Sequence, residues 1–163
     1  MRTVGHYLNQ QGQSVFRVFA PQHSALALQL EAPLQRLPMQ AEAEGYWSLT
    51  LPAQAEGTRY RFVLDGQAYP DPASCWQPDG VHAASAVVSI PRVNRTGWTG
   101  VAIEEAIIYE LHLGTFTPEG TLAAAQTRLP HLQALGINVI ELMPLATFPG
   151  QRNWGYDGTY LFA

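Results

Sequence analysis

The sequence has 163 residues, of which 47% are hydrophobic and 13% are charged, and its net charge is -4. An acidic chain lacks the basic surface that nucleic-acid phosphates or an anionic membrane attract, so neither is expected as a partner. The length suits one ordinary domain, or a small domain and part of another.

The only cysteine, Cys75, cannot form an internal disulfide. The sequence contains neither a leader peptide nor an apolar run of about 18 residues, the length that spans a membrane. We therefore expect a cytoplasmic protein.

Up to about residue 95, short β-type runs alternate with turn residues. In residues 60–64 (YRFVL), apolar side chains recur at every second position, and Asp65-Gly66 follows as a hairpin turn. Several such runs at short intervals predict a β-sandwich. The runs cover residues 14–20, 26–30, 46–51, 59–66 and 85–90.

After a predicted linker at residues 96–105, the pattern changes to strand, helix, strand. Residues 106–113 and 137–144 are continuous apolar runs, which predict parallel strands buried on both faces. Residues 121–136 carry leucines at helical spacing, with Pro130 expected to kink or divide the helix and Gly136 to end it. Such a β-α-β unit leaves open strand edges that further strands would cover in a complete domain, so we interpret the chain as ending early. Self-association through these edges is one alternative.

Three stretches resemble one known family. They are PDPASCWQPDGVH (70–82), GTFTPEGT (114–121) and FPGQRNWGYDG (148–158). With them, the sequence is similar to the N-terminal portion of the malto-oligosyltrehalose trehalohydrolase family, in the α-amylase superfamily (glycoside hydrolase family 13).

The resemblance implies a multi-domain architecture. Residues 1–95 would form an all-β immunoglobulin-like sandwich of the carbohydrate-binding module 48 type, and residues 96–105 would be the linker. Residues 106–163 would start a (β/α)8 TIM barrel, which takes about 250 residues, and would supply its first β-α-β segment and the following loop.

The implied activity is hydrolysis of the α-1,4-glucosidic bond next to the trehalose end of malto-oligosyltrehalose, with release of trehalose and no cofactor. Retaining glycosidases need two carboxyl groups about 5–5.5 Å apart. The resemblance puts these on later barrel strands, so no catalytic residue is assigned here and the chain alone is predicted to be inactive. Two alternatives stay open: a glycogen branching or debranching enzyme fragment, and a stand-alone, non-catalytic α-glucan-binding module.

The resemblance assigns substrate binding to Trp154, Tyr156 and Asp157. Aromatic rings stack on the apolar faces of sugars, and short polar groups bind sugar hydroxyls. By this resemblance, Tyr156 would stack on the sugar at the cleavage subsite. The competing interpretation is a glycine-rich turn whose rings merely pack on the barrel.

Other candidates are weaker. Glu110 and Glu141 lie in the predicted strands without a visible partner, so a structural role is favoured. His112 shares a strand face with Glu110, but no third ligand is in view and no metal site is predicted. Four aromatic residues could form a starch-binding platform, although aromatics in a sandwich more often lie in the core: Tyr46, Trp47, Trp76 and Trp98.

Overall fold

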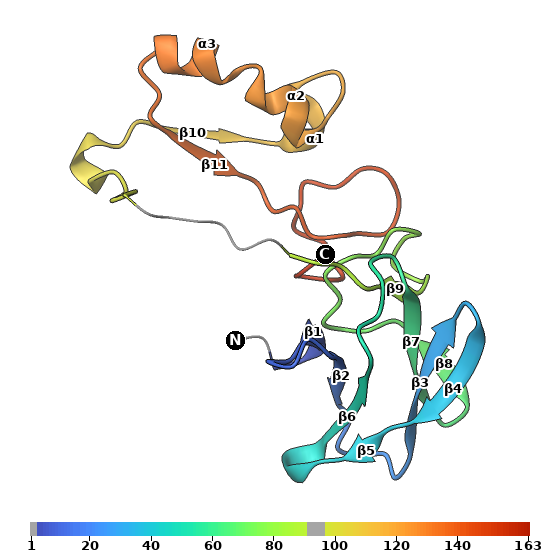
Figure 1. The fold of residues 1–163 in the computed structure, drawn as a ribbon. Coiled ribbons are helices and arrows are strands. Elements are labelled where there is room, and N and C mark those ends of the chain that lie inside the picture. Colours follow the sequence, from blue (N-terminus) through green and yellow to red (C-terminus); the bar gives the residue numbers. More distant parts are fainter. Residues whose placement is uncertain (1–2, 91–96) are drawn as a thin grey trace. The chain divides into compact units, whose positions relative to one another are not determined.

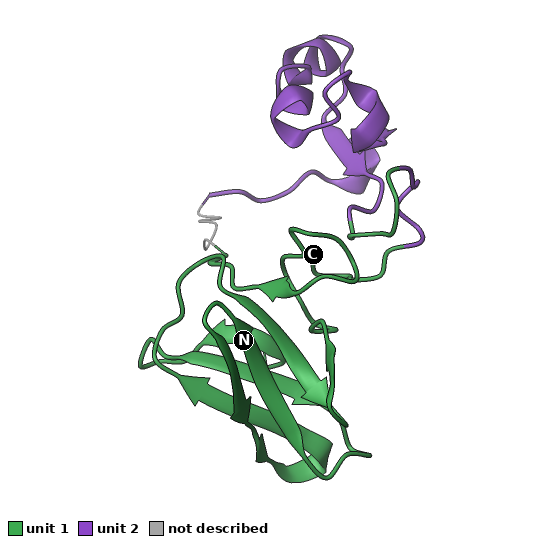
Figure 2. Cartoon of the chain, turned by 90° about the vertical axis from the view of Figure 1, so that its right-hand side faces the viewer, with its two compact units in different colours: residues 1–90, 146–151, 158–163 green, residues 91–145, 152–157 purple. Residues whose placement is uncertain are grey.

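The computed structural model describes residues 3–90 and 97–163 (Figure 1). These residues form two compact units, shown in different colours in Figure 2. The first unit contains residues 3–90, 146–151 and 158–163, and the second contains residues 97–145 and 152–157. The predicted domain end at residue 95 and the start of the linker at residue 96 lie outside the described residues.

The first unit is a sandwich of two antiparallel sheets. One sheet has the strand order β1-β2-β6-β5, and the other has the order β4-β3-β7-β8, with β9 also paired to β7. The strands of the first sheet are β1 (Gly5–Leu8), β2 (Ser14–Phe19), β5 (Gln40–Ala41) and β6 (Tyr46–Leu51). Those of the second are β3 (Leu26–Glu31), β4 (Leu34–Pro38), β7 (Arg59–Leu64), β8 (Gln67–Tyr69) and β9 (Ser85–Ala86).

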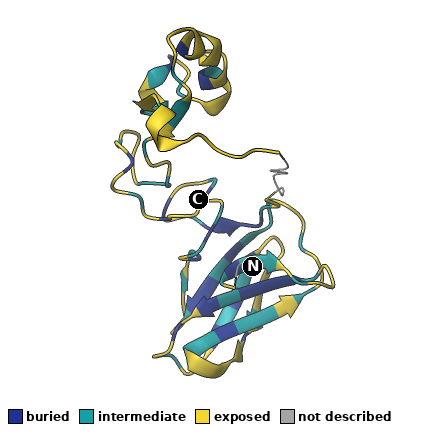
Figure 3. Cartoon of the chain, turned by 90° about the vertical axis from the view of Figure 1, so that its left-hand side faces the viewer, coloured by how far each residue is buried: buried dark blue, intermediate teal, exposed yellow. Residues whose placement is uncertain are grey.

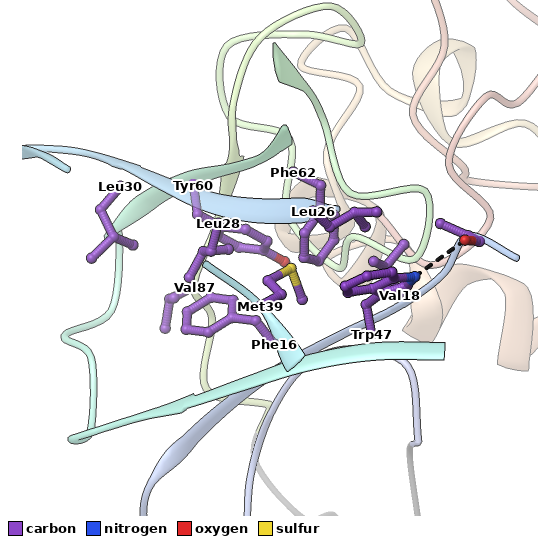
Figure 4. Packing of buried hydrophobic residues seen from close by; sticks show 11 residues of the cluster. Phe16, Val18, Leu26, Leu28, Leu30, Met39, Trp47, Tyr60, Phe62 and Val87 are labelled. Carbon is purple, nitrogen blue, oxygen red and sulfur yellow. Dashed lines mark hydrogen bonds between the residues drawn. The ribbon is translucent and has the colours of Figure 1, made fainter. Parts of the chain in front are cut away.

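The core of this unit lies between the two sheets (Figure 4). It forms because alternate residues of each strand point inward. Phe16, Leu28, Tyr60 and Phe62 are at most 1% exposed, and the ring of Phe16 meets that of Tyr60 edge-on. The sandwich predicted from the strand pattern is therefore confirmed.

A buried carboxylate ties the segment after β8 to the sandwich. Asp71 is fully buried, and its Oδ2 accepts a 2.6 Å hydrogen bond from the hydroxyl of Tyr60. Its Oδ1 accepts from the backbone N–H of Ala73, and its own N–H donates to Ser85 Oγ. A buried carboxylate is tolerated only when it is hydrogen-bonded in this way, so Asp71 has a structural role in the PDP turn.

The second unit is built on a parallel strand pair, β10 (Ile108–Leu111) and β11 (Val139–Leu142). Three short α-helices lie between them in the chain: α1 (Leu113–Phe116), α2 (Leu122–Gln126) and α3 (Leu129–Ala134). The predicted helix at residues 121–136 is thus divided, with Pro130 in the first turn of α3 and Gly136 following at φ +88°. One-turn 3-10 helices occur at η1 (Ala43–Gly45) and η2 (Ile103–Glu105).

The prediction that both strands of this unit are buried on both faces is wrong. Ile108, Tyr109 and Glu110 are exposed, and Leu111 is the only buried residue of β10. Figure 3 shows the whole chain coloured by burial. No residue of β11 is buried. Apolar strands of this kind need helices on both faces, and the described part of the unit supplies only short helices.

The last segment of the chain packs within the first unit. Thr147 forms an isolated antiparallel bridge with Tyr160, and the buried Tyr160 hydroxyl donates to the carbonyl oxygen of Val81. Burial, and next the negative charge of Asp71, raise the pKa of Tyr160 above its ordinary value of 10.0. No described helix combines the length and apolar character needed to cross a membrane.

Candidate substrate-binding loop

Asn153 organises the NWGYDG stretch at residues 153–158. Its Oδ1 accepts hydrogen bonds from the backbone N–H groups of Gly155 and Asp157. Its Nδ2 donates to Asp157 Oδ2 at 3.1 Å. An asparagine side chain that bonds to the backbone two residues later imitates a turn, so Asn153 fixes both the turn and the carboxylate of Asp157.

The two aromatic side chains of this loop face solvent. Trp154 is 76% exposed and Tyr156 is 67% exposed, whereas Gly155 between them is buried. Large rings left exposed on a turn held by its own hydrogen bonds are typical of a ligand contact surface. The structure brings Trp154, Tyr156 and Asp157 together on one short loop.

Gly155 explains how this turn stays compact. Its φ is +102°, and an added Cβ would overlap the carbonyl oxygen of Pro144. Only glycine adopts such a backbone readily and permits this close approach. The loop therefore packs directly on the residues that follow β11.

His112 supports the start of the loop. Its Nε2 lies 2.7 Å from the carbonyl oxygen of Asn153, and its Nδ1 lies 3.2 Å from Thr115 Oγ1. Because a carbonyl oxygen can only accept, Nε2 must carry the proton. His112 directly follows β10, so this bond ties the loop to the end of the first strand of the unit.

The GTFTPEGT stretch lies beside His112. Gly114 leaves room for the imidazole, since a Cβ there would lie 3.0 Å from His112 Cε1. Gly120 approaches the backbone of Gly114, and its N–H donates to Thr117. The motif shapes the surroundings of His112.

Trp47 does not belong to the aromatic platform that the sequence left possible. Trp47 is 9% exposed and donates from Nε1 to the Ala20 carbonyl oxygen inside the core, as Figure 4 shows. Trp76 is 37% exposed and lies under the guanidinium of Arg59, at 5.6 Å from the ring centroid. Trp98 is 74% exposed in the second unit. Trp47 therefore belongs to the core, as the competing interpretation had it.

Glu110 and Glu141 lie opposite each other on neighbouring parallel strands. Both are exposed, and no hydrogen bond or ion pair joins either side chain to another described residue. Within residues 3–90 and 97–163, no group of three or more histidine, cysteine, aspartate or glutamate side chains could hold a metal ion.

Sequence reasoning missed the supporting roles of Asn153 and His112. Asn153 could have been suspected, because asparagine two positions before a glycine suits a side-chain-capped turn. The bond from His112 joins residues 41 positions apart, and no local pattern signals it.

Comparisons with known proteins bear on both units. The sequence model of carbohydrate-binding module 48 (isoamylase N-terminal domain) matches residues 5–78. A malto-oligosyltrehalose trehalohydrolase from Saccharolobus solfataricus is 40% identical over 99% of this chain, and one from Deinococcus radiodurans is 48% identical over 73%. The crystal structure of a candidate alpha amylase from Salmonella typhimurium superposes on 99% of this chain with a TM-score of 0.89 and 42% identity.

The chain is homologous to the N-terminal region of malto-oligosyltrehalose trehalohydrolases. It spans 29% of the length of the Saccharolobus trehalohydrolase, 20% of that from Deinococcus, and 28% of the Salmonella chain. The family resemblance expected from the three sequence stretches is confirmed, and the match reaches through the NWGYDG loop in the Saccharolobus trehalohydrolase.

Proposed function

We propose that this chain is the N-terminal portion of a hydrolase that cleaves the α-1,4-glucosidic bond next to the trehalose end of malto-oligosyltrehalose and releases trehalose. The observation that carries the proposal is the 40% identity to a trehalohydrolase over 99% of the chain. The sandwich and the β-α-β segment would precede the remaining strands of a (β/α)8 barrel. The domain division at residues 95 and 106 is part of the same proposal.

In this proposal, the NWGYDG loop binds the substrate. It follows β11, and active sites of such barrels lie at the C-terminal ends of the strands. Tyr156 stacks on the sugar at the cleavage subsite, and Trp154 extends the apolar wall. Asp157, held by Asn153 at 3.1 Å, accepts hydrogen bonds from sugar hydroxyls.

The loop is pre-organised for this role. Holding a binding group in place before the substrate arrives lowers the entropy lost on binding. Asn153 supplies three bonds within the turn, and His112 anchors its carbonyl oxygen. The rings therefore need little rearrangement to contact a sugar.

The catalytic carboxyl groups are assigned to residues outside this chain. Glu110 and Glu141 are adjacent but exposed, and among the described residues neither has a hydrogen-bond partner that would orient it for attack on a glycosidic carbon. We therefore expect the 163-residue chain to be inactive by itself.

Product analysis tests the proposal. The protein encoded by the complete reading frame and the 163-residue chain are each incubated with malto-oligosyltrehalose. Trehalose is expected from the first and not from the second, and Tyr156→Ala should raise KM or lower kcat at an unchanged fold. New α-1,6 branches or cleavage of existing ones, without trehalose, would instead establish the branching or debranching alternative.

A second candidate function is binding of α-glucan by the sandwich itself. The match of residues 5–78 to a carbohydrate-binding module favours it. It would operate in this chain alone, whether or not hydrolysis occurs in a longer protein. Binding of maltohexaose to the 163-residue chain tests it, and failure to bind would reject it.

A further inference from the structure

A cavity of about 390 Å³ is lined by residues of both sheets of the sandwich, and none of the four aromatic residues considered as a platform is among its lining residues. Its volume falls in the range of about 300–1,000 Å³ that small-molecule sites occupy. Val18, Phe62 and Leu64 contribute its apolar part. Further lining residues are Phe19, Ala20, His23, Asp65, Gln67, Tyr69, Pro70 and Pro72.

Strand register directs one ring toward this cavity. Tyr69 on β8 pairs with Phe62 on β7, and Gln67 pairs with Leu64. Paired residues of antiparallel strands share a face of the sheet, so Tyr69 and Gln67 lie on the face that carries the core residue Phe62. Yet Tyr69 is 44% exposed, whereas Phe62 is 1% exposed. Tyr69 thus presents a partly exposed ring beside the apolar residues of the cavity.

Polar groups stand near the same ring. Asp65 Oδ2 lies 3.3 Å from His23 Nδ1, and its side chain is 83% exposed. Asp65 at φ +49° and Gly66 at φ +83° have the positive angles that a tight hairpin of type I′ requires, so the backbone that carries the carboxylate has a defined turn geometry. Gln67 adds an amide with both donors and an acceptor.

We propose that this cavity binds a short segment of α-1,4-glucan, with Tyr69 stacking on a glucose ring and Asp65, His23 and Gln67 bonding to its hydroxyls. A sugar has an apolar face and a polar rim, and it matches an aromatic ring beside a carboxylate and an amide. All the lining residues fall within residues 5–78, the part that matches a carbohydrate-binding module. This inference rests on the second candidate function and gives it a location.

Titration calorimetry of the 163-residue chain with maltohexaose tests the site. Tyr69→Ala should weaken binding about tenfold, the loss expected when one stacking contact is removed. Tyr69→Phe keeps the ring and should bind within about threefold of the parent. Asp65→Asn tolerates the same backbone angle and should also weaken binding, by about threefold.

Matched controls separate this site from the NWGYDG loop. Trp98→Ala removes an exposed ring outside the cavity and should leave the affinity unchanged, whereas Trp154→Ala tests the loop separately. Circular dichroism and the thermal midpoint show whether each variant is folded. Cellohexaose, a β-1,4-glucan, should bind at least about tenfold more weakly than maltohexaose.

Each outcome decides between the proposals. Absence of maltohexaose binding, equal binding of cellohexaose, or unchanged affinity in Tyr69→Ala overturns the cavity site. Loss of binding in Trp154→Ala alone overturns it too and assigns the glucan to the loop. Trehalose release by the longer protein is measured separately, so failure of the cavity and failure of the hydrolase assignment are distinguishable.

Discussion

The hydroxyl of Tyr160 donates a 2.9 Å hydrogen bond to the backbone carbonyl oxygen of Val81, 79 positions earlier in the chain. Tyr160 is 8% exposed, and it also forms the bridge with Thr147. One side chain therefore fastens residues 158–163 to a turn of the first unit.

Tyr160→Phe should lower the free energy of unfolding by about 1–2 kcal/mol, because the buried carbonyl of Val81 loses its donor while the ring volume is kept. Urea denaturation followed by tryptophan fluorescence measures the change. Leu161→Ala is the matched control, because this neighbour is 77% exposed and should change little. Equal stability of Tyr160→Phe and the parent would mean that the bond contributes nothing.

The stabilising effect of Tyr160 should also depend on pH. Its folded pKa lies above the ordinary value of 10.0, so the folded state keeps the proton while the unfolded state releases it. The contribution is thus complete below about pH 10 and is lost as the pH rises through the folded pKa. Denaturation at pH 8, 10 and 11 should show that the difference in unfolding free energy between the parent and Tyr160→Phe becomes smaller as the pH rises. A difference that does not change with pH contradicts this.

Two tryptophans of the sandwich should respond very differently to truncation. Trp47→Ala opens the core and should cost about 3–5 kcal/mol of unfolding free energy. Trp76→Ala, at a half-exposed ring, should cost about 1 kcal/mol or less. Thermal or urea unfolding measures both. Similar losses in the two variants would show that Trp76 packs as a core residue.

Asn153 should matter to substrate binding without touching the substrate. If the proposed function holds, Asn153→Ala in the protein encoded by the complete reading frame removes the hydrogen bonds that hold the turn and should raise KM for malto-oligosyltrehalose about tenfold. Asn153→Asp keeps the acceptor but places a second carboxylate beside Asp157, 3.1 Å from the replaced nitrogen, and should be no better. Raising the ionic strength should improve only Asn153→Asp. Unchanged KM in both variants would show that the loop keeps its shape without the hydrogen bonds of the Asn153 side chain.

The open edges of β10 and β11 should make this chain self-associate. Ile107, Ile108 and Tyr109 are 53%, 49% and 38% exposed. Ile108→Lys places a charge on this edge strand and should shift the sedimentation profile toward monomer. Leu34→Lys in the first unit, at a side chain that is 71% exposed, is the control and should not change it. A monomeric parent at all concentrations refutes the idea.

Local pattern predicted most of the long strands. β6 has the predicted bounds, and β7 ends where Asp65-Gly66 was expected to turn. These strands alternate strongly because one face meets the core. β1, β4, β5 and β8 were missed, and all four are short edge strands. The side chains of β4, β5 and β8 are mostly exposed, so these strands carry no alternating pattern.

Burial was harder to predict than secondary structure. The apolar sequence of β10 matched a doubly covered strand, but what covers a strand is decided by elements far away in sequence. The candidate loop shows the same limit. Trp154 and Tyr156 were assigned by resemblance alone, whereas the support from His112 depends on a contact that only the folded chain reveals.

The bridge between Thr147 and Tyr160 brings the two ends of the intervening stretch, residues 148–159, next to each other. A segment whose ends are fixed side by side can be exchanged without moving the framework that holds them. Residues 148–159 can therefore be replaced as one segment. Chimaeras that carry the corresponding stretch of the related trehalohydrolases would change the exposed rings of the loop while keeping the contact of Tyr160 with Val81.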